Sequence, residues 1–223
     1  MKIDKKDAAI ILLLAALGAL FLVFGDRFGW SDLIIGNITV FTFSLTTLYF
    51  SFSYDKWKKN KENEDKRKGI LKGIYKEIVE RARYLGYFKN LLVSQPDNPY
   101  IPLFPPFPKS AWESAIANGY YDPQHQSWVD YSYIYNATEN FFLNANFAND
   151  IAYKATVSDE IKLERLFSIH AILLSQAIEI MVIIDVNAKR LAEELSISIE
   201  ETKRLNDEIT KRIRETLGTA KGK

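Results

Sequence analysis

Arg165 and His170 are the side chains of this sequence whose types and spacing best suit catalysis. They occur as R-x4-H in the stretch RLFSIH, within a segment predicted to be helical. A histidine can transfer a proton near neutral pH, and an arginine can stabilise the charge that develops on a phosphate during substitution. The pair therefore suits cleavage of a phosphodiester. The alternative is that His170 only fills a packed core, where a histidine finds hydrogen-bond partners within the fold.

The spacing of Arg165 and His170 resembles the R-x4-6-H motif of HEPN-domain ribonucleases, which are all-helical bundles. In that family the arginine and the histidine are thought to act on the scissile phosphate of RNA. The resemblance implies a membrane-tethered ribonuclease with a nucleic-acid partner. This function is the alternative to a role in binding without catalysis.

Other catalytic chemistry is poorly represented in the sequence. The chain has 223 residues with no cysteine and two histidines, which excludes disulfides, thiolate nucleophiles and sulfur-bound zinc. It has no glycine-rich phosphate loop and no signature of paired carboxylates. The net charge of +1 favours neither nucleic acid nor an acidic partner. We therefore predict no cofactor and no metal site, and we favour a function without catalysis.

Two apolar stretches near the N-terminus predict the elements that position the rest of the chain. Residues 8–24 and residues 33–52 carry no charged side chain. At about 1.5 Å per residue, each stretch is long enough as a helix to cross the hydrocarbon core of a bilayer. Residues 8–54 are therefore predicted to form a two-helix transmembrane hairpin. A cleaved signal peptide is the alternative for the first stretch, but a second apolar stretch follows it closely.

Small residues predict how the two membrane helices pack. They lie in one stripe on each helix: Ala8, Ala15, Gly18, Ala19 and Gly25 on the first, and Gly36, Thr39, Thr42, Thr46 and Ser53 on the second. Such stripes allow helix backbones to approach closely. Asn37 adds a polar side chain near one end of the second helix, where we expect a hydrogen bond to the first helix. A site for an ion or a substrate is the alternative for Asn37.

The distribution of lysine and arginine predicts the orientation of the hairpin. Basic side chains precede the first span and follow the second, whereas the turn between the spans holds Arg27 against Asp26 and Asp32. Positively charged flanks stay on the cytoplasmic side, so residues 1–7 and all residues after the hairpin are predicted to be cytoplasmic. The expected location is the inner or cell membrane of a prokaryote, as a multi-pass protein with both termini in the cytoplasm.

A charged segment, residues 55–69, follows the hairpin and is predicted to lie beside the lipid headgroups. Its basic side chains are Lys56, Lys58, Lys59, Lys61, Lys66, Arg67 and Lys68. Anionic lipid attracts such side chains by about 1 kcal/mol for each unpaired basic residue. The alternative is that the segment only determines the topology of the hairpin.

Residues 70–217 are predicted to form a cytoplasmic, antiparallel helical bundle, which makes the fold class all-α. Apolar residues recur there at spacings of three and four, and residues 218–223 are expected to be a frayed tail. The apolar stretch 168–184 is the exception, since a third membrane span is an alternative to burial in the bundle. His170 and Glu179 interrupt that stretch, so we favour burial.

Two S-x-x-E sequences predict the beginnings of helices in this domain. In a capping box, the serine side chain accepts a hydrogen bond from the backbone N–H three residues later, and the glutamate bonds back to the serine N–H. The first predicted box joins Ser110 and Glu113, and the second joins Ser198 and Glu201. Both are interpreted as structural caps.

The stretch from Pro105 to Asn140 contains PPFPKSAWESAIANGYYDP, followed by YSYIYNATENFF. It resembles a segment of uncharacterised prokaryotic membrane-anchored proteins, in which a short membrane hairpin precedes a helical domain with a Pro-x-SAWE-like capping turn. The resemblance implies a fold and brings no known activity. The predicted anchor and the amphipathic helices favour a scaffold or interaction module at the cytoplasmic face. Its partners would be the lipid bilayer and either another protein or further copies of the chain.

Overall fold

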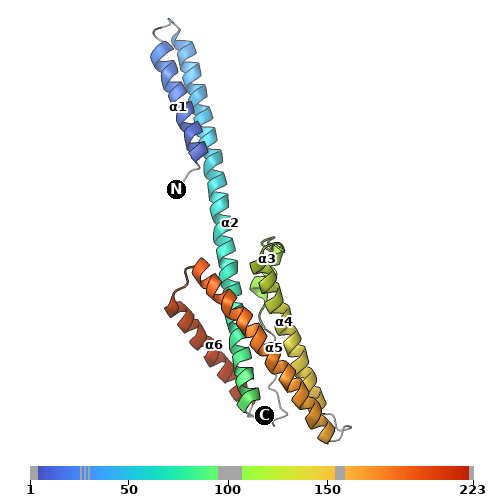
Figure 1. Cartoon of the computed structure of the whole chain (residues 1–223). Helices are drawn as coiled ribbons and strands as arrows, with labels where there is room; N and C mark the ends of the chain where they lie inside the picture. The colour runs from blue at the N-terminus through green and yellow to red at the C-terminus, as the bar shows by residue number, and fades with distance from the viewer. Residues whose placement is uncertain are drawn as a thin grey trace. The chain divides into compact units, whose positions relative to one another are not determined.

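The fold is all-α in the residues that the computed structural model describes, which are residues 5–25, 27, 29, 31–94, 107–153 and 159–220. Every regular element among them is a helix, as the sequence predicts, and none is a strand (Figure 1). Part of the predicted N-terminal segment and the end of the predicted tail lie outside these residues. The chain divides into two compact units, Met1–Lys66 and Arg67–Lys223.

The N-terminal unit contains α1 (Lys5–Gly25) and the first part of α2 (Asp32–Ser94). The two helices run antiparallel, because Tyr49 on α2 donates a hydrogen bond of 2.8 Å to the Asp7 carboxylate near the start of α1. Farther along the pair, a Cβ atom built on Gly18 would lie 3.2 Å from the Thr42 Cγ2 atom. This close approach agrees with the contact predicted from the two stripes of small residues.

Polar side chains of α2 in this unit bond within their own helix. The hydroxyls of Thr39, Thr42 and Thr46 each donate to the carbonyl four residues earlier, at 2.8 Å. Asn37 is exposed, and the described residues give it no hydrogen bond to α1. The structure therefore does not contain the interhelical bond that was expected from Asn37.

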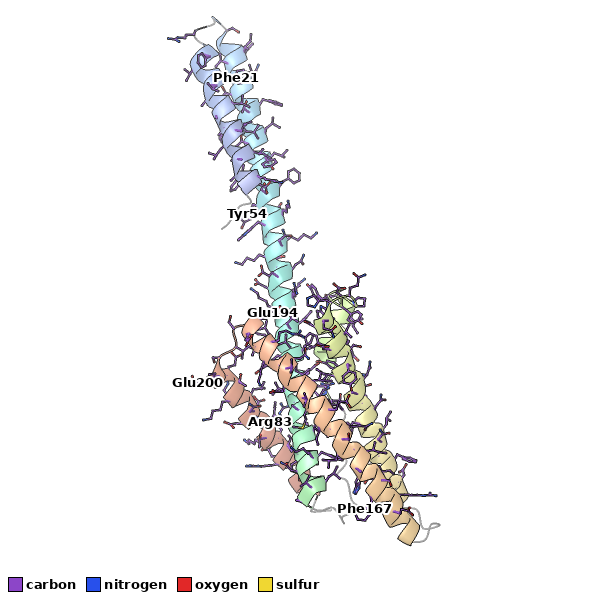
Figure 2. All side chains as sticks on the ribbon, viewed as in Figure 1. Phe21, Tyr54, Arg83, Phe167, Glu194 and Glu200 are labelled. Atoms are coloured by element: carbon purple, nitrogen blue, oxygen red, sulfur yellow. The ribbon has the colours of Figure 1, made fainter. Side chains whose placement is uncertain are left out.

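Three helices in the described residues are long and apolar enough to cross a membrane. They are Lys6–Gly25 in α1, Leu33–Ser94 in α2 and Phe167–Glu194 in α5. The three helices differ in how much of their most apolar stretch is buried. The buried share is 6% in α1, none in α2 and 28% in α5. Side chains project outward along the N-terminal unit (Figure 2). Among the large apolar ones, Leu12, Leu33 and Phe43 are 71%, 75% and 74% exposed.

α2 is 63 residues long and continues as a helix through the charged segment 55–69. That segment is rich in lysine and glutamate, which are good helix formers, and contains no proline. The seven basic side chains predicted at the membrane surface are all exposed on this part of the helix. The Lys61 ammonium lies 5.4 Å from the centre of the Trp57 ring, a cation–π contact at the start of the segment.

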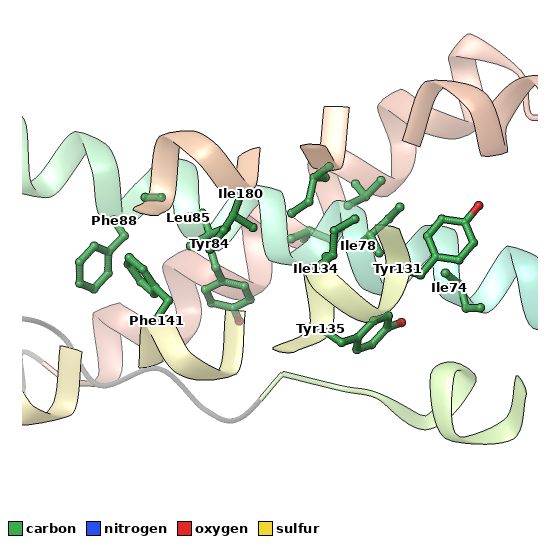
Figure 3. Packing of buried hydrophobic residues seen from close by; sticks show 14 of the residues in the cluster. Ile74, Ile78, Tyr84, Leu85, Phe88, Tyr131, Ile134, Tyr135, Phe141 and Ile180 are labelled. Carbon is green, nitrogen blue, oxygen red and sulfur yellow. The ribbon is translucent and has the colours of Figure 1, made fainter. Parts of the chain in front are cut away.

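The C-terminal unit packs the last part of α2 against α3 (Ser110–Ala117), α4 (Gln126–Tyr153), α5 (Asp159–Glu194) and α6 (Ile199–Ala220). α4 and α5 run antiparallel, since Asp130 contacts Arg190 whereas Asn144 contacts Gln176. Figure 3 shows the core at their junction with α2, where Ile78, Phe88 and Phe141 are among the buried side chains. The rings of Phe88 and Phe141 meet edge to face, with centroids 4.9 Å apart.

α3 lies close to α2 because Gly73 has no side chain. A Cβ atom at this position would lie only 2.6 Å from the Cβ atom of Ala111. α3 then ends at Gly119, whose φ of +69° is the left-handed conformation that favours glycine. The N–H of Tyr120 donates to the Ala115 carbonyl at 2.9 Å, which closes the end of the helix.

Candidate functional site

The predicted catalytic pair does not form an open site in this structure. Arg165 is exposed on α5, whereas His170 is buried, with 8% of its surface exposed. A histidine that transfers a proton must reach the scissile phosphate of its substrate. Neither side chain lines either of the two clefts described below. The arrangement therefore favours the alternative given above, in which His170 belongs to the packed interior.

Ser110 is not the N-cap of α3, so the first predicted capping box is wrong. The helix begins at Ser110 itself, and its N-cap is Lys109, which makes no side-chain cap bond. The Glu113 side chain is 63% exposed and lies 3.9 Å from the Lys109 ammonium. The cap comes instead from α2, because the N–H of Ala111 donates to a carboxylate oxygen of Glu77 at 2.9 Å. A fixed carboxylate at the positive end of the helix replaces the local serine.

The second predicted cap is present at the start of α6. Ser198 Oγ accepts a hydrogen bond of 3.0 Å from the backbone N–H of Glu201. This is the bond that satisfies an otherwise unpaired N–H in the first turn of a helix. Ser198 therefore has the structural role that the sequence predicts.

Glu77 and Arg81 form the centre of a buried polar network in the C-terminal unit. The Glu77 carboxylate accepts hydrogen bonds from Ser110 Oγ at 3.1 Å and from the Tyr135 hydroxyl. Arg81, which is fully buried, donates through Nε to Thr138 Oγ1 at 3.2 Å and through Nη1 to the Pro108 carbonyl at 2.8 Å. The network thus joins α2, α3, α4 and the residues before α3.

The burial of this network shifts the pKa values of its members. Loss of water around the Arg81 guanidinium lowers its pKa, although the nearby Tyr135 and Glu77 oppose this. Burial also raises the pKa of Tyr135, and its hydrogen bond to the Glu77 carboxylate raises it further. The guanidinium carbon of Arg81 lies 4.1 Å from the centre of the Tyr135 ring, so the ring face covers the charge. The Glu77 carboxylate and the Arg81 Nε and Nη1 atoms are thus paired, whereas Arg81 Nη2 is buried with no hydrogen-bond partner among the described residues. We interpret the network as structural.

A cleft of about 820 Å³ lies within the C-terminal unit between α2, α5 and α6. Ala82 and Gly86 on α2 face Ala188 and Ala192 on α5 across it. Each of these four residues has only a methyl group or no side chain, so they fill little of the space between the helices. The volume is typical of a ligand site, for which about 300–1,000 Å³ is usual. We call this the α2–α5–α6 cleft.

Polar links between α2 and α6 cross the α2–α5–α6 cleft. The Tyr75 hydroxyl lies 3.0 Å from Thr202 Oγ1, and Arg83 Nε donates to Asn206 Oδ1 at 2.9 Å. The lining also contains Lys189 and Arg214. With Asp185 as the one acidic side chain among the lining residues, the cleft combines an apolar floor with an excess of basic groups. Such a recess suits an apolar group that carries a negative charge at one end.

A second, shallower groove of about 400 Å³ lies between α4 and α5. Val129 and Tyr133 line it from α4, and Val182 and Val186 line it from α5. The Tyr133 hydroxyl donates a hydrogen bond of 2.6 Å to the Glu179 carboxylate, which raises the pKa of Tyr133. Asp130 also lines the groove, and its carboxylate lies 3.3 Å from the Arg190 guanidinium. The groove is therefore mainly apolar, and its one lining carboxylate is paired.

Neither metal chemistry nor a known relative assigns a function to these surfaces. No group of three or more histidine, aspartate or glutamate side chains within the described part of the chain could hold a metal ion. Comparison of the chain with known protein families, with curated proteins and with solved structures finds no match. The geometry of the two units is therefore the basis for a functional proposal.

Two features of the C-terminal unit were missed in the sequence, although each leaves a signal there. Glu77 and Arg81 lie at helical spacing on the same face as the apolar Ile74 and Ile78, and charges on an apolar face indicate a buried polar network. α5 carries apolar residues around its whole circumference over residues 167–186. A helix of that kind buries one face in its own core and leaves a second apolar face for another surface.

Proposed function

We propose that this protein is a membrane-anchored helical interaction module. In this proposal residues 8–54 cross the bilayer as a hairpin, and the C-terminal unit lies at the cytoplasmic face and binds a protein partner. The observation that carries the proposal is the exposure of nearly all apolar side chains in the most apolar stretches of α1 and α2. These side chains need an apolar surrounding that the N-terminal unit does not provide.

The energetic argument for an anchor follows from the number and size of those side chains. Transfer of one large aliphatic or aromatic side chain out of water stabilises a protein by roughly 1.5–3 kcal/mol. Leu12, Leu13, Phe41 and Phe43 are each more than 60% exposed in the N-terminal unit, as are several others. A hydrocarbon surrounding would therefore stabilise the unit far more than water does.

The positions of charge support cytoplasmic termini. Lys6 and Asp7 lie at the start of α1, and the charged segment begins at Asp55, shortly after the antiparallel partner Tyr49. The same end of the hairpin therefore carries the basic residues of both helices, whereas Arg27 is the one basic residue between them. Basic residues concentrate on the cytoplasmic side of membrane proteins.

The C-terminal unit supports a binding role through its two apolar recesses. The α2–α5–α6 cleft and the groove between α4 and α5 both present apolar side chains with polar groups at their edges. Interfaces between proteins are organised in this way, with an apolar centre and a polar rim.

Single-cysteine labelling tests the anchor and its orientation, because the chain contains no cysteine of its own. Arg27→Cys places a thiol in the turn between α1 and α2, and Lys203→Cys places one on the exposed side of α6. In intact cells a membrane-impermeant maleimide should label the first variant and not the second, and alkaline carbonate should leave both in the membrane pellet. Release by carbonate would overturn the anchor. Labelling of Lys203→Cys from outside would overturn the orientation.

A further inference from the structure

The outward side of α5 is apolar although the opposite side already fills the core. Leu173, Ala177 and Ile184 are buried at 0–1% exposure. Ile178, Val182 and Val186 lie at one-turn intervals on the other side and are 47%, 60% and 59% exposed. Phe167 and Ile172 continue the exposed apolar side toward the start of the helix, at 49% and 54% exposure. A helix that only covered its own core would place polar residues there.

α4 extends this apolar side into a continuous surface. Val129 and Tyr133 line the groove between α4 and α5 together with Val182 and Val186, and they are 43% and 40% exposed. We call the seven side chains the outer α4–α5 surface: Val129, Tyr133, Phe167, Ile172, Ile178, Val182 and Val186. At about 150–250 Å² for a full large side chain, their exposed portions amount to on the order of 700 Å². Apolar patches of this size usually mark an interaction site.

Charged groups beside the outer α4–α5 surface are already paired within the chain. Glu179 accepts the hydrogen bond of Tyr133 at 2.6 Å, and Asp130 contacts Arg190 at 3.3 Å. Asp185 and Lys189 form a further pair at 2.7 Å. A partner that covers the apolar centre would therefore not need to neutralise a buried charge, which is the condition for a stable interface.

We infer that the outer α4–α5 surface binds the same surface of a second copy of this chain. A stable interface takes about 800 Å² from each partner, and an apolar surface on the order of 700 Å² approaches that area. The surface is also self-complementary. In a two-fold contact centred on Val182, Ile178 of one copy meets Val186 of the other, so apolar side chains face apolar side chains along the helix.

The charges around the surface distinguish a second copy from the face of a bilayer. Helices that lie on a membrane surface carry an excess of lysine and arginine toward the anionic headgroups. Here Glu179, Asp130 and Asp185 outnumber Lys189 and Arg190. This balance opposes lipid binding and is compatible with a matching protein surface.

This inference rests on the proposed function, since it names the partner of the interaction module. Anchoring in one membrane would concentrate the copies in a thin layer, which favours even a modest interface. The test must therefore separate loss of pairing from loss of the anchor.

Disulfide formation in membrane vesicles tests the contact. Val182→Cys places a thiol at the centre of the surface, and Lys203→Cys places a matched exposed thiol on α6. Two thiols join when their Cα atoms come within about 7 Å of each other, so thiols held together at a contact form a disulfide faster than thiols that meet only by collision. We expect Val182→Cys to give about tenfold more covalent dimer than Lys203→Cys under the same oxidant. Equal yields from the two variants would overturn the inference.

A charge placed on the surface provides a second, independent readout. In the Val182→Cys background, Val186→Glu should reduce dimer yield about tenfold, because an unpaired carboxylate would be buried at the contact. Val93→Glu is the matched control, since Val93 is 64% exposed but lies on α2. An unchanged yield with Val186→Glu would overturn the inference. Carbonate extraction of the same samples reads the anchor separately, because loss of pairing leaves the protein in the pellet.

Discussion

The first and last parts of α2 belong to one helix yet meet opposite surroundings. Over residues 33–52 the helix is apolar on every side, and side chains such as Phe41 and Phe43 are 65% and 74% exposed. Over residues 70–92 charged and apolar residues alternate with helical spacing, and Ile74, Ile78 and Phe88 are 0–1% exposed. Helix formation is thus common to both parts. What differs is whether one face or the whole circumference is apolar.

α5 lies between these two extremes. It satisfies the same criteria of length and apolarity as the first part of α2, yet more than a quarter of its most apolar stretch is buried. Its core side and its outward side both carry apolar residues, so burial in the core of the C-terminal unit accounts for only one of the two sides. The length and apolarity of a helix therefore do not show by themselves whether it faces lipid or packs against protein.

The largest effect in the last part of α2 is expected from Glu77→Ala. Removal of this carboxylate takes the cap from α3 and the hydrogen-bond acceptor from Tyr135, and it leaves the charge of Arg81 buried beside a gap. We expect the free energy of unfolding of the C-terminal unit to fall by about 3–5 kcal/mol. Urea unfolding followed by tryptophan fluorescence measures this. Glu62→Ala, in the exposed charged segment, is the control that should change little.

Truncating one large apolar side chain in each part of α2 tests whether the two parts differ in burial. Ile78→Ala opens a cavity in the core and should cost about 2–5 kcal/mol in the unfolding of the C-terminal unit. Leu48→Ala removes a side chain that is 56% exposed and should change that unfolding by less than about 0.5 kcal/mol. Equal losses from the two variants would contradict the difference in surroundings that the structure gives them.

Two glycines one turn apart test how closely α3 packs on α2. Gly73→Ala introduces a Cβ atom 2.6 Å from that of Ala111 and should destabilise the C-terminal unit by about 1–3 kcal/mol. Gly69→Ala adds its Cβ atom where nothing lies within 4 Å, so it should stabilise the helix by about 0.5–1 kcal/mol. Thermal unfolding by circular dichroism measures both. A stabilising Gly73→Ala would mean that α3 does not pack against α2 at this point.

The smallest effect is a pH dependence from Glu80 in the last part of α2. Burial raises the pKa of Glu80, and this outweighs the lowering by Arg212, whose guanidinium lies 3.3 Å away. The folded pKa therefore lies above the ordinary glutamate value of 4.5, so the stabilising contribution is complete below that value and is lost as pH rises through the folded pKa. Glu80→Gln should flatten the decline in stability as pH rises above about 4.5. An unchanged slope would contradict this shift.

Much of the local structure was predictable because it depends on neighbouring residues. The apolar stretches 8–24 and 33–52 are helical, Ser198 caps α6, and Gly119 ends α3. Helical periodicity, caps and terminating glycines all act over a few residues, so a single sequence contains the information. The seven basic residues after the second apolar stretch are exposed for the same reason, since no apolar spacing directs them inward.

One prediction that failed, the cap of α3 by Ser110, depends on residues far apart in the chain, and so do the surroundings of Arg165 and His170. Ser110 lies in a sequence typical of an N-cap, but the Glu77 carboxylate on α2 accepts the hydrogen bonds of the Ala111 N–H and of the Ser110 hydroxyl at the start of α3. Arg165 and His170 have a catalytic spacing, but the packing of α5 exposes one and buries the other. The residues around Ser110 do not show that a carboxylate from another helix will cap α3. The residues of α5 likewise do not show which of its apolar sides packs in the core.

The all-helical class, the strongly apolar N-terminal stretches and some helix ends, such as the Ser198 cap of α6, follow from the sequence alone. Backbone hydrogen bonding and helical spacing are local, and the amino-acid order is sufficient for them. Three features depend on the tertiary structure. Glu77 and Arg81 are buried together, the α2–α5–α6 cleft lies between three helices, and α5 has exposed apolar residues opposite its buried side. Those features depend on which helices pack side by side, because burial belongs to the contact and not to the residue.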